Sequence, residues 1–370
     1  MVDLVTQYKR MQSEMDAAVS KVIHSGEYIN GKWVQDFSSN LAVYTGAKYV
    51  VPCANGTDTL QIALMALGLQ PGDEVIIPDF TYIAAAEAIA LLKLTPVPVD
   101  VDPLTFNIDV KKMSAALSLK TKAIIPVHLF GQCSDMAPIL KIAKENALHV
   151  IEDNAQSIGS VYTFPTGEKQ QAGTLGDVGA LSFFPTKNLG CYGDGGALLT
   201  NNEALAQKMR MIASHGQSQK YCHEVIGCNS RLDTLQAAIL NVKLPYLNAW
   251  IQSRQKTAQA YNEALEVRTD LYEIPECSPS STHVYHQYTL KVKQNKRDAL
   301  QKYLKEKGVP TLIYYPNPLH KQPAFRGVIR IGGDLSETEK LCKSVLSLPI
   351  HPELAEEQIR HITDLLSNYE

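Results

Sequence analysis

The segment Leu181–Gly196, with the sequence LSFFPTKNLGCYGDGG, combines an apolar run, a proline, one lysine and a glycine-rich loop. The lysine is Lys187, and Pro185 interrupts the apolar run just before it. A lysine on a rigid, partly dry loop is a candidate Schiff-base nucleophile, because desolvation disfavours the ammonium form and frees the amine. The segment also suits a phosphate on the glycine loop with Lys187 as counter-ion, or a surface lysine before a turn. Taken alone, it slightly favours the surface lysine.

Strand and helix patterns alternate on the N-terminal side of this segment and extend just beyond it, from residue 49 to residue 200. This alternation predicts an α/β domain with a mostly parallel sheet. Beyond residue 250 the pattern changes to one half-buried strand and several amphipathic helices, which indicates a smaller α+β domain. We therefore expect a large domain over residues 1–248, including an N-terminal helical arm, and a small C-terminal domain over residues 249–370.

Three further expectations concern the connections. Residues Val2–His24 have apolar positions at helical spacing and are expected to form one helix. The polar stretch His215–Asn229 is expected to be a loop, and Arg231–Leu247 a helix.

Composition excludes several classes of function. The chain has 370 residues, a formal charge of −3 and no long basic run, so nucleic-acid binding has no electrostatic support. Its seven cysteines form no CxxC pair, and Cys222, His223 and Cys228 match no usual zinc spacing. The longest apolar stretch, Ile83–Leu94, is too short to span a bilayer, and the N-terminus lacks the apolar core of a signal peptide. We expect a cytoplasmic protein without a metal site.

A second candidate site lies where a short strand meets a helix, at Asn55-Gly56-Thr57. A helix N-terminus leaves backbone N–H groups unpaired, and these can bind a phosphate. Ordinary N-capping by Asn55 or Thr57 explains the same residues equally well.

Two more candidates follow strands. The buried-type strand Val150–Asp153 ends in a carboxylate, and ligands bind at the carboxyl ends of strands in doubly wound sheets. Asp153 and Gln156 are therefore expected to face a ligand, although Asp153 is also suited to cap the following segment. Tyr82 is expected to open an alanine-rich helix, where its ring could cover a planar ligand or lie in the core or rim.

Together these residues supply a lysine, a phosphate cradle, a carboxylate at a strand end and an aromatic ring. Pyridoxal 5′-phosphate (PLP) needs all four, because its aldehyde condenses with an amine, its phosphate suits a helix N-terminus and its ring nitrogen must stay protonated.

The chain resembles the DegT/DnrJ/EryC1/StrS family of PLP-dependent sugar aminotransferases, which have the aspartate-aminotransferase fold type I. The resemblance covers nearly the whole chain and rests on ordered motifs: Ala54–Asp58, Pro78–Tyr82, Val127–Gly131, Ile151–Gln156, Ser182–Lys187, Gly193–Gly196, Asn229–Asp233 and Tyr315-Pro316.

The resemblance implies a role for each candidate. Lys187 would form the internal aldimine and later move a proton between the substrate carbon and the cofactor. Asp153 would pair with the pyridine nitrogen, Gln156 would lie near the phenolic oxygen, and Tyr82 would stack on the ring. The residues implied for the phosphate are Gly56, Thr57 and Ser182, completed by Asn229 of a partner subunit, so the active unit would be a homodimer.

The resemblance also implies the substrates: L-glutamate as amino donor and a nucleotide-linked keto-sugar as acceptor, in amino-sugar synthesis for surface polysaccharide. The segments His215–Tyr221 and Tyr314–His320 match regions that reach the sugar nucleotide. Tyr314, Tyr315 and His320 are candidates there, although Tyr315 and His320 also fit ordinary packing and turns.

Glutamine at position 156 favours a 3-keto over a 4-keto sugar, since relatives acting on 4-keto sugars often have histidine there. A non-catalytic regulator with this fold is the alternative from another class of function. A nicotinamide-dependent enzyme is disfavoured because no GxGxxG follows the first strand.

Overall fold

The computed structural model describes residues 1–369. It is organised around a seven-stranded sheet in the order β1-β9-β8-β5-β4-β2-β3. Its strands are β1 (Tyr49–Cys53), β2 (Glu74–Pro78), β3 (Thr95–Val99), β4 (Thr121–Ile124), β5 (His149–Asp153), β8 (Val178–Ser182) and β9 (Gly196–Thr200). The strands from β8 to β3 are parallel, and β9 runs antiparallel to both of its neighbours. The expected α/β fold with a mostly parallel sheet is confirmed.

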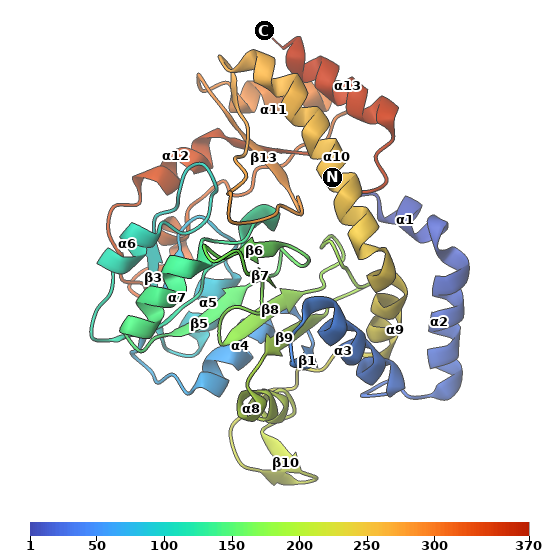
Figure 1. Cartoon of the computed structure of the whole chain (residues 1–370), viewed down its shortest axis with the longest axis vertical. Helices are drawn as coiled ribbons and strands as arrows, with labels where there is room; N and C mark the ends of the chain where they lie inside the picture. The colour runs from blue at the N-terminus through green and yellow to red at the C-terminus, as the bar shows by residue number, and fades with distance from the viewer. Residues whose placement is uncertain (370) are drawn as a thin grey trace.

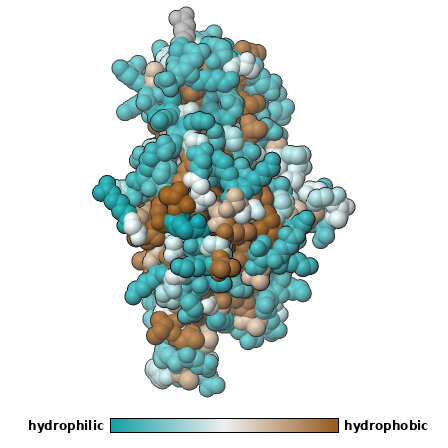
Figure 2. Space-filling model, turned by 90° about the vertical axis from the view of Figure 1, so that its left-hand side faces the viewer, coloured by the Kyte–Doolittle hydropathy of each residue, from teal (hydrophilic) through white to brown (hydrophobic). Residues whose placement is uncertain are grey.

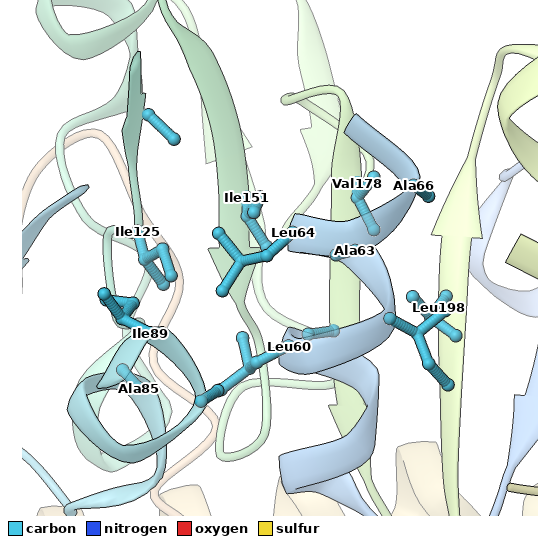
Figure 3. Packing of buried hydrophobic residues seen from close by; sticks show 14 of the residues in the cluster. Leu60, Ala63, Leu64, Ala66, Ala85, Ile89, Ile125, Ile151, Val178 and Leu198 are labelled. Carbon is cyan, nitrogen blue, oxygen red and sulfur yellow. The ribbon is translucent and has the colours of Figure 1, made fainter. Parts of the chain in front are cut away.

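One face of the sheet is covered by α4 (Gly56–Leu67), α5 (Ala84–Leu91) and α8 (Glu203–Ala213) (Figure 1). Leu60, Ala63 and Leu64 of α4 lie over side chains from β5, β8 and β9 (Figure 3). Because this cluster is fully apolar, its burial fixes the N-terminal end of α4 relative to the strand ends.

The other face is covered by α3 (Lys32–Thr45), α9 (Thr234–Lys243), α6 (Val110–Ala115) and α7 (Met136–Glu145). Neighbouring residues of β9 serve the two layers in turn, because side chains alternate along a strand. Leu198 packs against α4 and α8, whereas Ala197 and Leu199 pack in the cluster that holds Phe37 and Leu41 of α3.

The C-terminal part has its own core. The long helix α10 (Leu247–Leu265) leads into an antiparallel sheet of β12 (Tyr272–Glu273), β13 (Tyr288–Val292) and β14 (Val345–Leu348). Helices α11 (Arg297–Glu306) and α13 (Glu356–Ser367) pack on this sheet through apolar residues between 258 and 366. A domain division at residues 248 and 249 stays a prediction.

The predicted single helix at Val2–His24 is wrong. The structure has α1 (Leu4–Arg10) and α2 (Gln12–Ser25), separated at Met11, whose φ of −123° is not helical. Met11 and Met15 pack against Ile239 of α9, so burial of the Met11 side chain accompanies the break.

Two other boundaries also differ. The expected loop His215–Asn229 contains a hairpin of β10 (Gln217–Gln219) and β11 (Cys222–His223), which projects at the lower end of Figure 1. The helix expected from Arg231 begins only at Thr234, because Asn229 and Asp233 form isolated β-bridges with Ser214 and Ile29.

Helix α12 (Ser336–Ser344) is followed directly by β14, so the two elements share no connecting loop. The sequence patterns also missed α6 and the hairpin of β6 (Val161–Thr163) and β7 (Lys169–Gln171). None of the helices within residues 1–369 is both long and apolar enough to cross a membrane.

Candidate active site

The candidate site lies where β5 and β8 end. Asp153 is the last residue of β5, and Ser182 is the last residue of β8. The backbone continuing from β4 reaches the same edge, because the N–H of His128 donates to the carbonyl of Asp153 at 3.0 Å. The carboxyl ends of three parallel strands thus meet here, as the doubly wound arrangement predicts.

Lys187 lies in the loop that joins β8 to β9. Its N–H donates to the carbonyl of Phe184 at 2.8 Å, which closes a tight turn after Pro185. Two hydrogen bonds anchor the loop to the rest of the protein. Asn188 in the loop donates to the carbonyl of Val284 at 3.2 Å, and Lys243 of α9 donates to the carbonyl of Gly190 in the loop at 2.7 Å. The alternative of a free surface lysine is excluded, since Lys187 is partly buried on an anchored loop.

Lys187 and Asp153 lie close enough to influence each other's charge. Burial lowers the pKa of Lys187 to about 8, against the opposing effect of the Asp153 carboxylate. Burial raises the pKa of Asp153, although the N–H of Ala155, at 3.1 Å, and the charge of Lys187 act in the other direction. A larger fraction of this amine is therefore in its free form near neutral pH than for an exposed lysine, and the amine becomes mostly free above pH 8 or so.

The N-terminus of α4 forms a cradle of backbone N–H groups beside Ser182. Asn55 caps the helix by accepting the N–H of Asp58 at 2.8 Å, which leaves the N–H groups of Gly56 and Thr57 without an acceptor in the described residues. A Cβ on Gly56 would lie 2.6 Å from the Cβ of Ser182, so the close approach requires glycine. Capping by Asn55 is confirmed. Two N–H groups stay free, and phosphate binding by them stays a prediction.

Gln156 and Tyr315 form a hydrogen-bonded pair in the candidate site. The Oε1 atom of Gln156 accepts the N–H of Phe130 at 2.7 Å, and its Nε2 donates to the Tyr315 hydroxyl at 3.2 Å. These two hydrogen bonds fix the amide with its N–H₂ group toward Tyr315. Burial raises the pKa of Tyr315, so the hydroxyl stays protonated. Tyr314 is only partly buried beside it.

Tyr82 precedes α5 instead of opening it, and 59% of the residue is exposed. Its ring lies 6.3 Å from that of Tyr315, measured between centroids. A core position for Tyr82 is therefore excluded, and one side of its ring is available for a planar ligand.

His320 is held by two carboxylates. Its backbone N–H and its Nδ1 contact the two oxygens of Asp79 at 2.9 and 2.6 Å, and its Nε2 lies 3.3 Å from Glu339. Both ring nitrogens are thus engaged within the chain. This arrangement favours the packing role for His320 over contact with substrate.

Asn229 is exposed, and it lies far from Lys187 in the sequence. The next residue, Ser230, is buried and accepts the N–H of Ala54 at 3.1 Å, close to the cradle of α4. A contribution of Asn229 to a partner subunit stays a prediction.

A buried pair next to Asp153, formed by His128 and Glu152, was not predicted from the sequence. The N–H of Ser134 donates to Nδ1 of His128 at 3.1 Å, so Nε2 carries the proton and donates to Glu152 at 2.8 Å. Glu152 also accepts three backbone N–H groups at 2.7–2.8 Å. Cys133 completes a metal-like group, but both Glu152 oxygens are already occupied. The sequence signal that could have predicted this pair is Glu152 itself, because a glutamate in a buried strand needs hydrogen-bonding partners.

The chemical groups that the structure brings together at this site fit PLP. An amine with a lowered pKa, a buried acid, two free N–H groups at a helix N-terminus and an exposed tyrosine ring belong to the candidate site, and they match the groups that this cofactor requires.

The pattern of the DegT/DnrJ/EryC1/StrS aminotransferase family matches residues 9–367. A "pleiotropic regulatory protein" of Geobacillus stearothermophilus is 47% identical, over 100% of this chain and 98% of the relative. The UDP-2-acetamido-2-deoxy-3-oxo-D-glucuronate aminotransferase of Pseudomonas aeruginosa is 46% identical, over 99% of each. The UDP-N-acetyl-3-dehydro-alpha-D-glucosamine 3-aminotransferase of Acidithiobacillus ferrooxidans is 41% identical, over 99% and 96%.

Solved structures have the same fold. An aminotransferase of this family from Brucella abortus superposes with a TM-score of 0.94 and 41% identity, over 100% of this chain and 98% of that one. DesV of Streptomyces venezuelae, solved with a ketimine intermediate, gives 0.94 and 38%, over 99% and 97%. NtdA of Bacillus subtilis, solved with bound PMP, gives 0.88 and 34%, over 96% and 81%. The chain belongs to the DegT/DnrJ/EryC1/StrS aminotransferase family.

Proposed function

We propose that the protein is a PLP-dependent aminotransferase that transfers the amino group of L-glutamate to a nucleotide-linked 3-keto sugar. The observation that carries this proposal is the charge interaction of Lys187 with Asp153 at the carboxyl ends of β5 and β8, where Ser182 contacts the N-terminus of α4. The product would be an amino sugar for surface polysaccharide.

When bound, PLP supplies an aldehyde that captures amines and a ring that accepts electrons from the substrate carbon. Lys187 would hold the cofactor and then move a proton at the substrate carbon, for which a pKa of about 8 is suited. Asp153 would keep the ring nitrogen protonated. The N–H groups of Gly56 and Thr57 and the hydroxyl of Ser182 would hold the phosphate.

Other side chains of the candidate site would orient the ring of the cofactor. Gln156, whose Nε2 faces Tyr315, would donate to the phenolic oxygen, and Tyr82 would cover one face of the ring. Tyr315 and Tyr314 would border the sugar, with Tyr315 fixed by Gln156.

Two observations support a 3-keto substrate. The relatives from P. aeruginosa and A. ferrooxidans are named for 3-oxo and 3-dehydro sugars. Gln156, rather than histidine, occupies the position that favours this class. A 4-keto sugar is the alternative acceptor.

We also propose a homodimer in which Asn229 reaches the phosphate site of the partner subunit. Exposed apolar side chains suit a second copy: Tyr221 and Ile226 near the β10–β11 hairpin are 83% and 86% exposed. Figure 2 shows hydrophobic residues around the middle of one side of the molecule and near the lower end, where this hairpin projects.

A regulatory role is a second candidate, favoured by the name of the G. stearothermophilus relative. The retained Lys187, Asp153 and Gln156 weigh against a protein that binds without catalysing. The two candidates differ in turnover, because a regulator would not need to convert a keto-sugar.

The test incubates the purified protein and PLP with L-glutamate and UDP- or dTDP-linked 3-keto and 4-keto sugars, followed by mass spectrometry. We expect the amino sugar from a 3-keto substrate. Conversion of 4-keto sugars alone would overturn the positional assignment. Failure to convert any sugar, together with no change of the cofactor spectrum on adding glutamate, would overturn the aminotransferase proposal.

A further inference from the structure

Lys243, the last residue of α9, is the one buried lysine within residues 1–369, with 1% of the residue exposed. Burial lowers its pKa to about 8, against the opposing effects of Cys191 and Glu353, so most of this side chain is charged at pH 7. It forms no ion pair with a carboxylate of the described residues. A buried ammonium without such a partner costs folding free energy, which an apolar side chain of similar length would avoid.

The contacts of this ammonium lie in the loop that carries Lys187. The Nζ atom of Lys243 donates to the carbonyl of Gly190 at 2.7 Å and lies 4.2 Å from the centroid of the Tyr192 ring. A charged donor strengthens the hydrogen bond, and the face of an aromatic ring attracts a cation. Gln236, also on α9, accepts the N–H of Tyr192 at 2.9 Å. Helix α9 thus holds this part of the loop at two points.

Gly190 transmits this hold to the backbone of Lys187. A Cβ on Gly190 would lie 2.5 Å from the carbonyl oxygen of Pro185 and 2.9 Å from that of Phe184, so the two parts of the loop touch through their backbones. The same Phe184 carbonyl accepts the N–H of Lys187 at 2.8 Å. A displacement of Gly190 would therefore disturb the turn from which the Lys187 side chain extends.

We propose that Lys243 is a positioning residue for Lys187: its ammonium holds the Gly190 end of the loop, which directs the Lys187 amine toward the cofactor aldehyde. This inference rests on the proposed function, in which Lys187 binds PLP. It explains why a charge is kept in a buried position where an apolar side chain would fit. Lys243 itself does not react with the cofactor.

The test separates the aim of Lys187 from the rest of the cofactor site. Cofactor-free full-length protein is titrated at pH 7, by fluorescence, with PLP and with pyridoxamine 5′-phosphate (PMP). PMP shares the ring and the phosphate of PLP but has an amine in place of the aldehyde, so it cannot bond to a lysine. A loss of PLP affinity without a loss of PMP affinity reports on Lys187 alone.

Three substitutions of Lys243 and one control are compared. Lys243→Met and Lys243→Gln both remove the charge, so that one remains informative if the other does not fold, and Lys243→Arg retains it. Lys291→Met is the matched control, because Lys291 is also shielded and donates to a backbone carbonyl, that of Pro103, at 2.8 Å. It lies on β13, in the C-terminal sheet.

We expect Lys243→Met to weaken PLP binding at least about tenfold and Lys243→Gln at least about threefold, with PMP affinity unchanged within about twofold. Lys243→Arg should restore most of the PLP affinity, and Lys291→Met should change neither affinity. Unchanged PLP affinity in the neutral variants would overturn the inference. Equal losses of PLP and PMP affinity would overturn it as well, because they would indicate damage to the whole site.

Lys187→Ala distinguishes failure of this inference from failure of the proposed function. It should weaken PLP binding and leave PMP binding unchanged, since only PLP can bond to the amine. Wild-type PLP affinity in Lys187→Ala would overturn the role of Lys187 in the proposed function, whatever the Lys243 variants show.

Discussion

At the scale of single residues, the amine of Lys187 controls cofactor capture. Its pKa is lowered to about 8 from the usual 10.5, so the free amine forms as the pH rises through about 8. In cofactor-free protein, the rate of PLP incorporation should rise with pH and level off above about 8. Stopped-flow absorbance at a series of pH values measures this, and a midpoint near 10.5 would contradict a buried Lys187.

Substitution of Asp153 tests the interaction between Lys187 and Asp153 from the side of the acid. The Asp153 carboxylate raises the pKa of Lys187, so Asp153→Asn should move the midpoint of that pH profile to lower pH. The variant should also lose about 100-fold or more in kcat/KM, because the ring nitrogen loses its anionic partner. An unchanged midpoint together with wild-type turnover would show that Asp153 does not face the cofactor.

Sequence patterns predicted the types of residue at the site better than their partners. Lys187, Asp153 and Gln156 were identified from motifs, since each needs only its residue type and its place after a strand. The partners of Gln156, the Phe130 N–H and the Tyr315 hydroxyl, are 26 and 159 residues away in sequence. Contacts over such separations leave no local periodic signal, and the same holds for the anchoring of His320 by Asp79.

At the scale of elements, the N-terminus of α4 provides the phosphate cradle. Gly56→Ala would bring a Cβ within 2.6 Å of the Cβ of Ser182, so the end of the helix must shift. Its free N–H groups would then no longer point at the proposed phosphate position. We expect at least about tenfold weaker PLP binding, equivalent to about 1.4 kcal/mol. Fluorescence titration of cofactor-free protein measures this affinity.

Gly68→Ala is the control at the other end of the same helix. Gly68 has a φ of +80°, which strains an alanine by about 1 kcal/mol, but a Cβ there meets no atom closer than 3.9 Å. Gly68→Ala should therefore lower the free energy of unfolding without weakening PLP binding. Equal loss of PLP affinity in both variants would mean that helix stability, not the cradle, governs binding.

Helix α12 is attached to the large sheet through its N-terminus. Asp100, just after β3, accepts the N–H groups of Glu337 and Thr338 at 2.9 and 2.7 Å and the Lys112 ammonium at 2.8 Å. Asp100→Ala should lower the free energy of unfolding by about 3 kcal/mol, because it leaves Lys112 and the helix end unpaired. Urea unfolding measures the loss.

Asp334→Ala is the matched control for that prediction. Asp334 also contacts the start of α12, through the N–H of Ser336 at 3.1 Å, but the contact is exposed. Its removal should cost less than about 1 kcal/mol. Similar losses for Asp334→Ala and Asp100→Ala would contradict the attachment of α12 by Asp100.

Element boundaries show where sequence patterns fail. The amphipathic spacing before Thr234 resembles a helix, yet Asn229–Asp233 is extended because its backbone bridges to two distant segments. The antiparallel insertion of β9 between β1 and β8 likewise depends on tertiary pairing, since nothing in a five-residue strand specifies its direction.

At the scale of the whole molecule, the proposed shared site predicts complementation. Neither Lys187→Ala nor Asn229→Ala alone should be fully active. Mixed dimers of the two variants regain one site with both native residues, so activity should reappear when the proteins are unfolded and refolded together. Coupled glutamate-dependent turnover measures this, and no recovery in verified mixed dimers would exclude the contribution of Asn229 to a partner.

The central claim is that one amine in the molecule holds the cofactor. Borohydride reduction of the PLP-loaded protein, followed by protease digestion and mass spectrometry, measures which amine that is. The account predicts a phosphopyridoxyl group on Lys187 alone, even though Lys243 is also buried with a pKa lowered to about 8. An adduct on Lys243 or on any other lysine, with Lys187 unmodified, would contradict it.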